Sequence, residues 1–377
     1  MKIPLSLYIH IPWCIRKCPY CDFNSHETKQ TIPEKLYVET LMQDLDTYLP
    51  KLSHKELVSI FFGGGTPSLF SATAIEKILS GVHQRFSLSS STEITLEANP
   101  GTIEQKKFSD FRAAGINRLS LGIQSFQNEK LNSLGRIHNS ETAQQAILQA
   151  KKAGFQNMNL DIMYGLPHQS IKEAIHDLHI AITNEPKHIS WYQLTIEPNT
   201  YFYRYPPKLP HDTLTWEMQE QGQALLAEKG YVQYEVSAYS HLQHQCIHNK
   251  NYWEFGDYLG IGAGAHSKLS ALNINKITRH AQVKLPRDYL DLKKKKTATH
   301  SELSEKDKIF EFMLNALRLS HGFSSKLFTE RTGVLLEKIK PQLNEAVQKK
   351  WIVENDTHLC PTVLGKRFLN DIIQLFF

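Results

Sequence analysis

Six short apolar runs, separated by helix-like stretches, constrain the fold of this chain more than any other feature. The runs occupy residues 5–11, 58–62, 93–99, 118–124, 158–163 and 188–196. Apolar residues recur at helical spacing between them, as in residues 34–49, 141–153, 171–184 and 214–229. Strands that alternate with helices are typical of a parallel sheet covered by helices. We therefore predict an α/β fold whose sheet is either an open wound sheet or a partial barrel.

The ends of the predicted helices carry recognisable boundary signals. Pro50 follows the first helix and is a plausible stop signal. Ser140 is a candidate N-cap and Gly154 a candidate C′ residue of the helix between them. Gly230 follows the last of these helices. These signals predict helix boundaries close to the limits of the apolar periodicity.

Four of the six runs alternate between an apolar face and a face that carries polar groups. Successive side chains of a strand point to opposite sides of the sheet, so each run has one face for the helices and one for the interior. A lumen that holds a polar ligand at the carboxyl ends of the strands would need such an interior face; alternatively, the polar residues hydrogen-bond to one another. The interior set is Ser6, Tyr8, His10, Glu93, Thr95, Glu97, Ser120, Gly122, Gln124, Asn159 and Asp161.

Three cysteines follow the first run at C-x3-C-x2-C spacing: Cys14, Cys18 and Cys21. A cubane iron–sulfur cluster normally takes four cysteines, so three local thiolates would leave one iron open for another ligand. A structural zinc site with His10 or His26 as the fourth ligand is the alternative. We predict an open iron–sulfur cluster on this loop.

The second run ends in the segment Gly-Gly-Gly-Thr-Pro at residues 63–67. Glycines allow close approach of the backbone and can leave N–H groups available to an anionic or carbonyl oxygen. The segment lacks the lysine of a phosphate-binding loop and the spacing of a dinucleotide fingerprint. It is therefore either a ligand contact or only a tight turn from strand to helix.

Histidines gather after the sixth unit, at residues 241, 244 and 248, together with Cys246. His248 is close in sequence to Tyr252 and Trp253, and an imidazole beside an apolar wall suits a flat macrocycle with an iron that takes histidine as an axial ligand. Zinc binding by this histidine and cysteine group is the competing interpretation.

The rest of the chain indicates three parts: residues 1–240, 241–300 and 301–377. Residues 284–304 contain four consecutive lysines at 293–296, which favours a solvated linker. Beyond them, helical stretches followed by a short hairpin predict a winged-helix-like α+β module. Such a module often binds DNA, but this one is not strongly basic, so we expect it to serve packing or interaction.

Composition agrees with a cytoplasmic protein that has a sizeable core. The chain has 377 residues, of which 41% are hydrophobic, and 43 lysines and arginines against 38 acidic residues give a net charge of +5. That charge does not by itself indicate nucleic-acid binding. We find no signal peptide and no apolar run of about 18 residues or more, and three clustered cysteines suit a reducing compartment.

Together, these motifs resemble the radical S-adenosylmethionine (SAM) superfamily, and within it the coproporphyrinogen-oxidase-like branch. The resemblance covers nearly the whole chain. It rests on residues 8–12 with the three cysteines, and on residues 63–67, 96–100, 120–126, 161–167 and 248–253.

The resemblance implies a partial (β/α)6 radical-SAM barrel with a 4Fe-4S cluster held by Cys14, Cys18 and Cys21. The amino and carboxylate groups of SAM would complete the open iron. The implied SAM contacts are Tyr8, Gly65, Thr66, Glu97, Gln124, Arg136 and Asp161. Alternation alone also places four of these residues on the interior faces of the strands: Tyr8, Glu97, Gln124 and Asp161.

Two departures separate the candidate subgroups of the branch. The oxygen-independent coproporphyrinogen III oxidases carry a fourth cysteine where this chain has Phe23, and they carry an extension before the first strand, which begins here at about residue 5. Both departures favour the HemW-type haem chaperones, which bind haem and deliver it to haem proteins. We expect the chain to lack the oxidase activity, and by resemblance His248 is the best candidate for a haem contact or ligand.

The partners expected from this resemblance are haem or another porphyrin and the proteins that accept haem. Peripheral membrane association through those acceptors and a homodimer are further expectations, whereas nucleic acid is not expected. The alternative functions are oxidative decarboxylation of coproporphyrinogen III and, from the winged-helix-like tail and the lysine run, a radical-SAM reaction on RNA.

Overall fold

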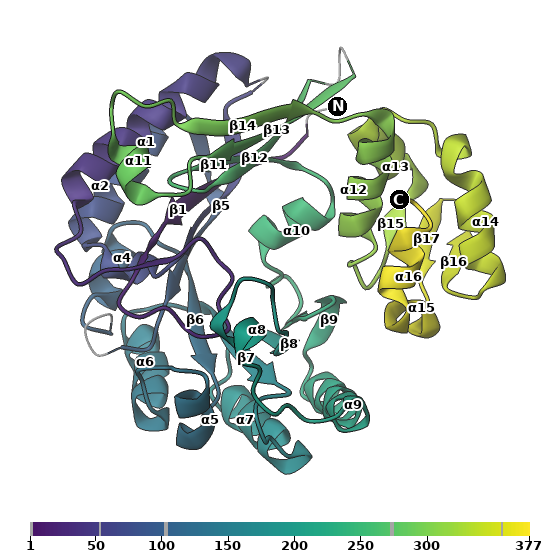
Figure 1. Cartoon of the computed structure of the whole chain (residues 1–377), viewed down its shortest axis with the longest axis horizontal. Coiled ribbons are helices and arrows are strands. Elements are labelled where there is room, and N and C mark those ends of the chain that lie inside the picture. Colours follow the sequence, from purple (N-terminus) through teal and green to yellow (C-terminus); the bar gives the residue numbers. More distant parts are fainter. Residues whose placement is uncertain (1–2, 53, 102–104, 272–274, 356) are drawn as a thin grey trace.

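The structure is a computed structural model that describes residues 3–52, 54–101, 105–271, 275–355 and 357–377. At the centre of its main sheet lie six parallel strands in sequence order, each joined to the next through at least one helix (Figure 1). The strands are β1 (Leu5–Ile11), β4 (Glu56–Gly64), β5 (Ser87–Ala98), β6 (Arg118–Gln124), β7 (Asn157–Tyr164) and β8 (His188–Gln193). The predicted partial (β/α)6 barrel is confirmed, with the sheet order running from β14 to β9 as an open series.

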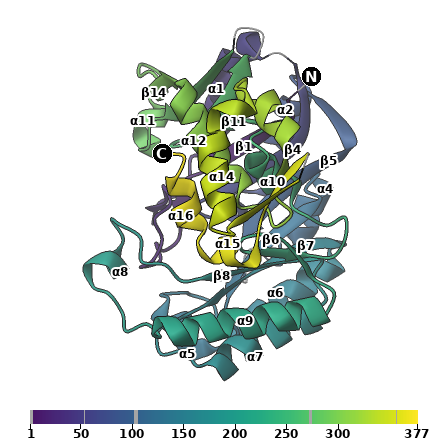
Figure 2. The ribbon, with the colours of Figure 1, turned by 90° about the vertical axis from the view of Figure 1, so that its right-hand side faces the viewer.

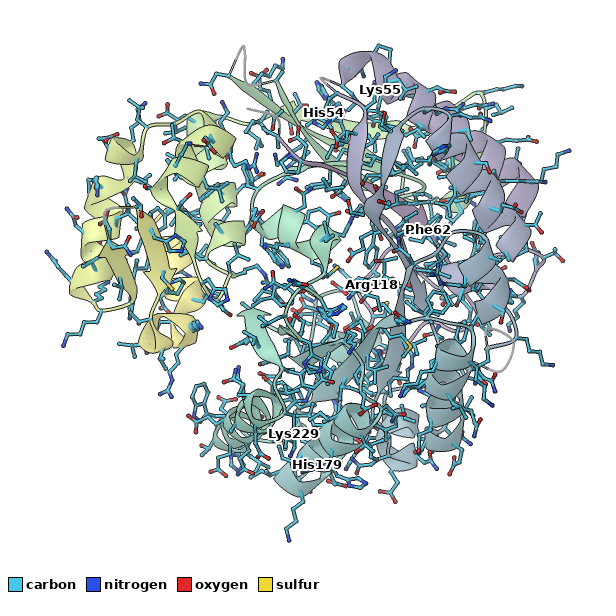
Figure 3. The ribbon with its side chains drawn as sticks, turned by 180° about the vertical axis from the view of Figure 1, so that it is seen from behind. His54, Lys55, Phe62, Arg118, His179 and Lys229 are labelled. Carbon is cyan, nitrogen blue, oxygen red and sulfur yellow. The ribbon has the colours of Figure 1, made fainter. Side chains whose placement is uncertain are left out.

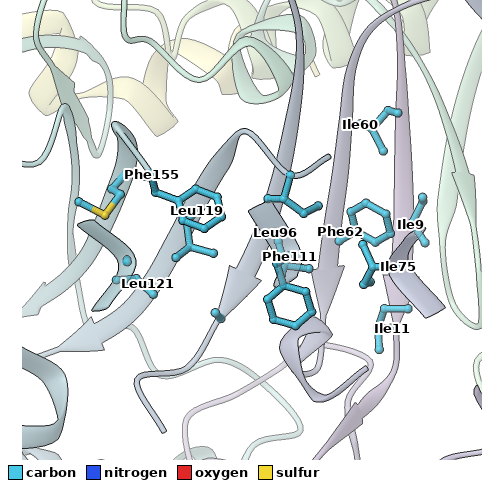
Figure 4. Close-up of a cluster of buried hydrophobic side chains, with 14 of the residues drawn as sticks. Ile9, Ile11, Ile60, Phe62, Ile75, Leu96, Phe111, Leu119, Leu121 and Phe155 are labelled. Atoms are coloured by element: carbon cyan, nitrogen blue, oxygen red, sulfur yellow. The ribbon is translucent and has the colours of Figure 1, made fainter. Parts of the chain in front are cut away.

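The helices cover the outer face of the sheet, as Figure 1 shows. They are α1 (Glu34–Tyr48), α2 (Ala72–His83), α4 (Phe108–Ala113), α5 (Asn128–Ser133), α6 (Ser140–Lys152), α7 (Ile171–Thr183) and α9 (Asp212–Glu228). The apolar faces predicted from alternation pack beneath them, and Figure 4 shows Ile9, Leu96 and Leu119 beside Ile75 and Phe111 of the helices. Burial of each such side chain contributes about 1.5–3 kcal/mol.

Helix boundaries differ from the sequence signals at one end of α6. The N-cap is Asn139, whose side chain accepts a hydrogen bond from the N–H of Thr142, so the prediction of Ser140 was wrong by one residue. Asn139 is as good a cap as serine, and its amide oxygen reaches the same backbone donor. Gly154 adopts φ +85 and Gly230 φ +80, as expected for residues that end helices. The first helix ends at Tyr48 and continues as the 3-10 turn η1 (Leu49–Lys51), which contains Pro50.

Residues after the sixth parallel strand extend the sheet at both edges. β10 (Ala238–Ser240) and β9 (Val232–Glu235) continue it beyond β8, and β11 (Asp257–Ile261) pairs in parallel with β1. β12 (His266–Ala271), β13 (Lys276–Gln282) and β14 (Thr297–Glu302) follow in antiparallel order. The predicted linker at 284–304 is therefore wrong, because it contains helix α11 (Pro286–Leu290) and the edge strand β14.

Polar side chains of the inner face contact one another near the amino-terminal ends of the parallel strands. Arg118, which Figure 3 places inside the molecule, lies 3.8 Å from a carboxylate oxygen of Glu93. Asn159 is hydrogen-bonded to His188 (2.6 Å), which in turn contacts the hydroxyl of Tyr234 (2.8 Å). These contacts follow the alternative in which polar side chains pair with one another, although Arg118 Nε and the hydroxyl of Thr95 have no hydrogen-bond partner among the described residues. At the carboxyl-terminal ends of the strands, the inward side chains line a cavity instead.

The carboxyl-terminal module has a second apolar core. The module lies beside the barrel in Figure 1 and faces the viewer in Figure 2. Its helices are α12 (Glu305–Ala316), α13 (Ser325–Thr332), α14 (Lys340–Gln348), α15 (Val363–Arg367) and α16 (Leu369–Gln374), with the 3-10 turn η4 (Leu336–Ile339). Its sheet has the order β15 (Phe323–Ser324), β17 (His358–Pro361) and β16 (Ile352–Asn355), which agrees with the predicted winged-helix-like arrangement. Of the helices in the described ranges, none is both long and apolar enough to cross a bilayer.

Gly222 of α9 is a position where the packing leaves no room for a side chain. A Cβ atom placed there would lie 1.8 Å from ring carbon Cη2 of Trp191, which is fully buried on β8. Alanine normally stabilises a helix interior by roughly 0.5–1 kcal/mol relative to glycine. We expect Gly222→Ala to lower the free energy of unfolding instead, by about 1–3 kcal/mol, because it overpacks the core.

Denaturant titration measures this change, and Gln221→Ala on the exposed side of the same helix is the matched control. The control should stay within about 0.5 kcal/mol of the parent protein. Equal stabilities for both variants would show that the Trp191 ring can move aside.

Candidate functional site

The three clustered cysteines lie on one loop at the carboxyl end of β1. Cys14 ends the two-residue strand β2 (Trp13–Cys14), which pairs with β3 (His26–Glu27), and is buried; Cys18 and Cys21 are half-buried. The N–H of Cys21 donates to the carbonyl of Cys18 (3.1 Å), which turns the loop back on itself. All three line one cavity of about 470 Å³. Burial, followed by the neighbouring Cys21 and Cys18, raises the pKa of the Cys14 thiol to about 11.

The donor set fits a cubane cluster better than a single metal ion. Among the described residues, no three His, Cys, Asp or Glu side chains converge on one point that could hold a metal ion. A zinc site needs such convergence, whereas a cubane takes each thiolate on a different iron and keeps the sulfurs apart. His10 is also committed elsewhere, since its ring nitrogens contact the Tyr8 hydroxyl (3.1 Å) and the carbonyl of Asn24 (2.9 Å).

Residues 63–67 hold the cysteine loop rather than offering vacant donors. The N–H of Gly65 donates to the carbonyl of Ile11 and that of Thr66 to Trp13, each at 2.8 Å. The N–H of Gly64 donates to the carboxyl of Glu97 (3.3 Å). Of the two alternatives for this segment, the hydrogen bonds of these three N–H groups favour the tight turn. The close approach is real, because a Cβ at Gly65 would lie 2.4 Å from the carbonyl oxygen of Trp13.

The structure brings six of the seven predicted SAM residues to the cavity that the cysteines line. They come from three strands and two loops: Gly65, Thr66, Glu97, Gln124, Arg136 and Asp161. Tyr8 is the exception, because it lines an adjoining cavity. The Tyr8 ring and the Glu97 carboxyl lie close together where the two cavities meet. Both flank Gly63, because a Cβ atom at that residue would lie 2.9 Å from Tyr8 Cε2 and 3.2 Å from Glu97 Oε2.

Arg136 joins the cysteine loop to the barrel strands. Its guanidinium donates to Asn99 Oδ1 (2.6 Å), to the carbonyl of Gly122 (2.9 Å) and to the sulfur of Cys18 (3.6 Å). Its buried Nε has no hydrogen-bond partner among the described residues, and neither has Oε1 of Gln124. Gln124 also has φ +63 at a bulge of β6, a strained conformation of the kind found at ligand sites. An unpaired donor and an unpaired acceptor on one cavity fit a zwitterionic ligand such as SAM.

Two carboxyl groups lie deeper in the same cavity. Burial, followed by the charge of the neighbouring Asp161, raises the pKa of Glu97 to about 8. Burial also raises the pKa of Asp161, against hydrogen bonds from Asn159 (2.9 Å) and Ser120 (3.1 Å). The pair therefore offers one carboxyl that retains its proton near neutral pH and can donate a hydrogen bond.

Sequence reasoning missed several residues that line this cavity. Asn99 orients Arg136 and donates to the hydroxyl of Thr66 (3.0 Å). Ser190 and Tyr192 alternate inward on β8. The sixth strand had been recognised, and the same two-residue alternation applied to it would have identified both.

His248 lies inside the barrel and does not face either cavity. It lies on α10 (Ile247–Trp253) with 2% exposure, and its ring contacts the hydroxyls of Ser59 (2.9 Å) and Tyr252 (3.2 Å). The ring stacks on Phe61 with centroids 4.8 Å apart, and burial, followed by Arg118, lowers its pKa to about 3. The prediction of His248 as a haem contact is not supported by this position, because both ring nitrogens already have partners.

The aromatic pair predicted beside His248 does not form one wall. Tyr252 faces His248, whereas Trp253 lies under the guanidinium of Arg318 at 4.3 Å, towards the carboxyl-terminal module. The zinc alternative for this segment also fails, because Cys246 contacts Glu93 (3.5 Å) and no convergent ligand group occurs in the described residues.

The buried carboxyl of Glu97 should leave a signature in the pH dependence of stability. Between its ordinary value of 4.5 and about 8, Glu97 keeps its proton in the folded chain and loses it on unfolding. Because unfolding then releases a proton, stability falls as pH rises through this window. Glu97→Gln should weaken this fall and raise the melting temperature at pH 8, by roughly 1–2 °C for each kcal/mol gained.

Thermal unfolding without added SAM, followed from pH 5 to pH 8.5, measures this effect. Glu39→Gln, at an exposed position of α1, is the control and should behave like the parent protein. A melting temperature for Glu97→Gln that declines with pH as steeply as the parent's would contradict the assignment.

Comparison with known proteins agrees with the geometry. Residues 8–181 match the Radical SAM superfamily, and residues 303–368 match the HemN C-terminal domain. The "Heme chaperone HemW" of Haemophilus influenzae is 48% identical over 99% of this chain and 98% of its own length, and the HemW protein of Escherichia coli is 47% identical over the same shares. The solved structure of coproporphyrinogen III oxidase (HemN) from Escherichia coli shares the fold, with a TM-score of 0.83 at 21% identity over 100% of this chain and 90% of that one.

The likeness to both HemW proteins spans nearly the full length of each, so it includes the cysteine loop, the barrel and the carboxyl-terminal module together. The chain belongs to the HemW family of the radical SAM superfamily.

Proposed function

We propose that this protein is a haem chaperone that binds haem and delivers it to haem proteins, and that it carries a 4Fe-4S cluster and SAM. The observation that carries the proposal is the identity of 48% and 47%, over 98% of their lengths, to two proteins named heme chaperones. The site supports it, because the three-thiol loop and a cavity with unpaired polar groups meet at the same end of the barrel.

The residues of the cavity that the three cysteines line would hold the cluster and SAM as follows. Cys14, Cys18 and Cys21 supply the thiolates, and the guanidinium of Arg136 is suited to a carboxylate because it binds in a planar fork. When bound, the cluster and SAM supply one-electron chemistry. Glu97 offers a protonated carboxyl to a hydrogen-bond acceptor of the ligand.

Coproporphyrinogen III oxidation is the function to be tested against this proposal. The structural similarity to the oxidase, at 21% identity, shows the fold alone. Position 23, where the resemblance predicts a fourth cysteine in the oxidases, is Phe23, which is 60% exposed at the mouth of the cavity. We infer that the chain lacks the oxidase activity and acts in the cytoplasm on proteins that accept haem.

The decisive experiment adds haem and porphyrinogen to the same cluster-reconstituted protein. We expect a haem absorption band that saturates with titration, followed by transfer of the haem to an added apo-haem protein. Anaerobic incubation with SAM, a reductant and coproporphyrinogen III should yield no protoporphyrinogen. Formation of that product, or failure to bind haem, would reverse the ranking of the two functions.

The cluster assignment makes a separate prediction. Cys18→Ser should lose most of the iron and acid-labile sulfide, because an alcohol is a much poorer ligand than a thiolate for an iron–sulfur cluster. Iron and sulfide analysis after anaerobic reconstitution gives the measurement. Cys360→Ser, in β17 of the carboxyl-terminal module, is the control and should retain the parent's content. Equal iron in both variants would contradict the three-cysteine site.

A further inference from the structure

A second cavity, of about 590 Å³, opens beside the cavity that the three cysteines line, at the same end of the barrel. The two linings share Lys17, Asp22, Phe23, Gly64 and Glu97, so the cavities adjoin. The volume falls in the range of about 300–1,000 Å³ that is usual for sites of small molecules and cofactors. None of the predicted SAM contacts except Tyr8 and Glu97 lines it.

Aromatic rings form the walls of this second cavity. Tyr8 of β1, Tyr252 of α10 and Tyr258 of β11 line it from the barrel, and the exposed ring of Phe23 belongs to the cysteine loop. Tyr252 and Tyr258 are in edge contact, with centroids 4.3 Å apart. His248 contacts the hydroxyl of Tyr252 from behind. Such walls suit a flat, largely apolar ring system.

One histidine of the cavity has an uncommitted imidazole. His266, the first residue of β12, is exposed and lines the cavity, and its ring makes no hydrogen bond with the described residues. His10 lines the same cavity with both ring nitrogens engaged. Partial desolvation, then Arg279 and Lys284, lowers the pKa of His266. Its ring is therefore neutral at pH 7, which is the form that binds metals.

Two lysines provide positive charge at the same cavity. The ammonium of Lys17 donates to the carbonyls of Phe23 (3.1 Å) and Ser25 (3.3 Å) and retains a third proton for an acceptor. Lys284 is exposed on the same lining, which also includes Asp22. Cations beside aromatic walls fit a ring system that bears carboxylates.

We propose that the second cavity is the binding site for an iron tetrapyrrole and that His266 supplies an axial ligand to its iron. The proposal rests on the proposed haem-binding function and names the site for it. It assigns His248 a different role, that of a support behind the Tyr252 wall. The cavity that the cysteines line is then left to the cluster and SAM.

The test compares parent protein, His266→Ala, His248→Ala and His83→Ala in titrations with haem and with iron-free protoporphyrin. His83 is an exposed histidine at the end of α2 and is the matched control. We expect His266→Ala to bind haem about tenfold more weakly or worse, a loss of about 1.4 kcal/mol. The loss should vanish with the iron-free ring, and added imidazole should restore the parent's haem spectrum.

His266→Met keeps a ligand of a different kind, so it should bind haem with an altered spectrum. Circular dichroism and cluster content verify that each variant is folded. If the parent protein binds haem and His266→Ala matches it in affinity and spectrum, the site assignment is overturned while the proposed function stands. If His248→Ala alone loses the iron-dependent affinity, the ligand is His248. No haem binding by the parent protein would overturn both.

Discussion

The contact between the cysteine loop and residues 63–67 is the constraint on which the rest of the site depends. Two backbone hydrogen bonds, from Gly65 to Ile11 and from Thr66 to Trp13, fasten the start of the loop onto the end of β4. This geometry excludes a side chain at Gly65. Because Cys14 follows Trp13 directly, these bonds hold its backbone close to the end of β4. Arg136 then joins Cys18 to the strand ends from the other side.

The lumen has two levels with different chemistry. Towards the amino-terminal ends of the strands, polar side chains fill the interior: Glu93 faces Arg118 and accepts hydrogen bonds from backbone N–H groups, and Asn159 is hydrogen-bonded to Ser120. Towards the carboxyl-terminal ends, the cavity beside the cysteine loop is lined by Glu97, Gln124 and Arg136. Ligands of parallel-strand barrels bind at the carboxyl-terminal end. The polar residues at the amino-terminal ends close the bottom of the barrel, which we call its floor. Their hydrogen bonds leave few polar groups available to a ligand.

The sequence predicted the faces of the strands well but not the depth of each residue along them. Glu93 and Glu97 lie on one face of β5, and alternation cannot show that one binds the backbone of α10 while the other faces the cavity. The enclosed position of the His248 ring could not be predicted, for a related reason. Its partner Ser59 is 189 residues away, so no local motif could show that the ring is enclosed. Asn99, Ser190 and Tyr192 were within reach of the alternation rule, whereas His266 depends on the pairing of β12 with β13, which sequence periodicity did not reveal.

The floor of the barrel also ties helix α10 to the stability of the whole sheet. The carboxylate of Glu93 on β5 accepts hydrogen bonds from the backbone N–H groups of Ile247 and His248 (3.2 and 3.1 Å) while it faces Arg118 on β6. Local unfolding of α10 would leave the carboxylate with fewer partners in a buried setting, which is costly. The amide protons of this short helix should therefore exchange with solvent only when the barrel itself unfolds, unlike those of a seven-residue helix held by its own hydrogen bonds.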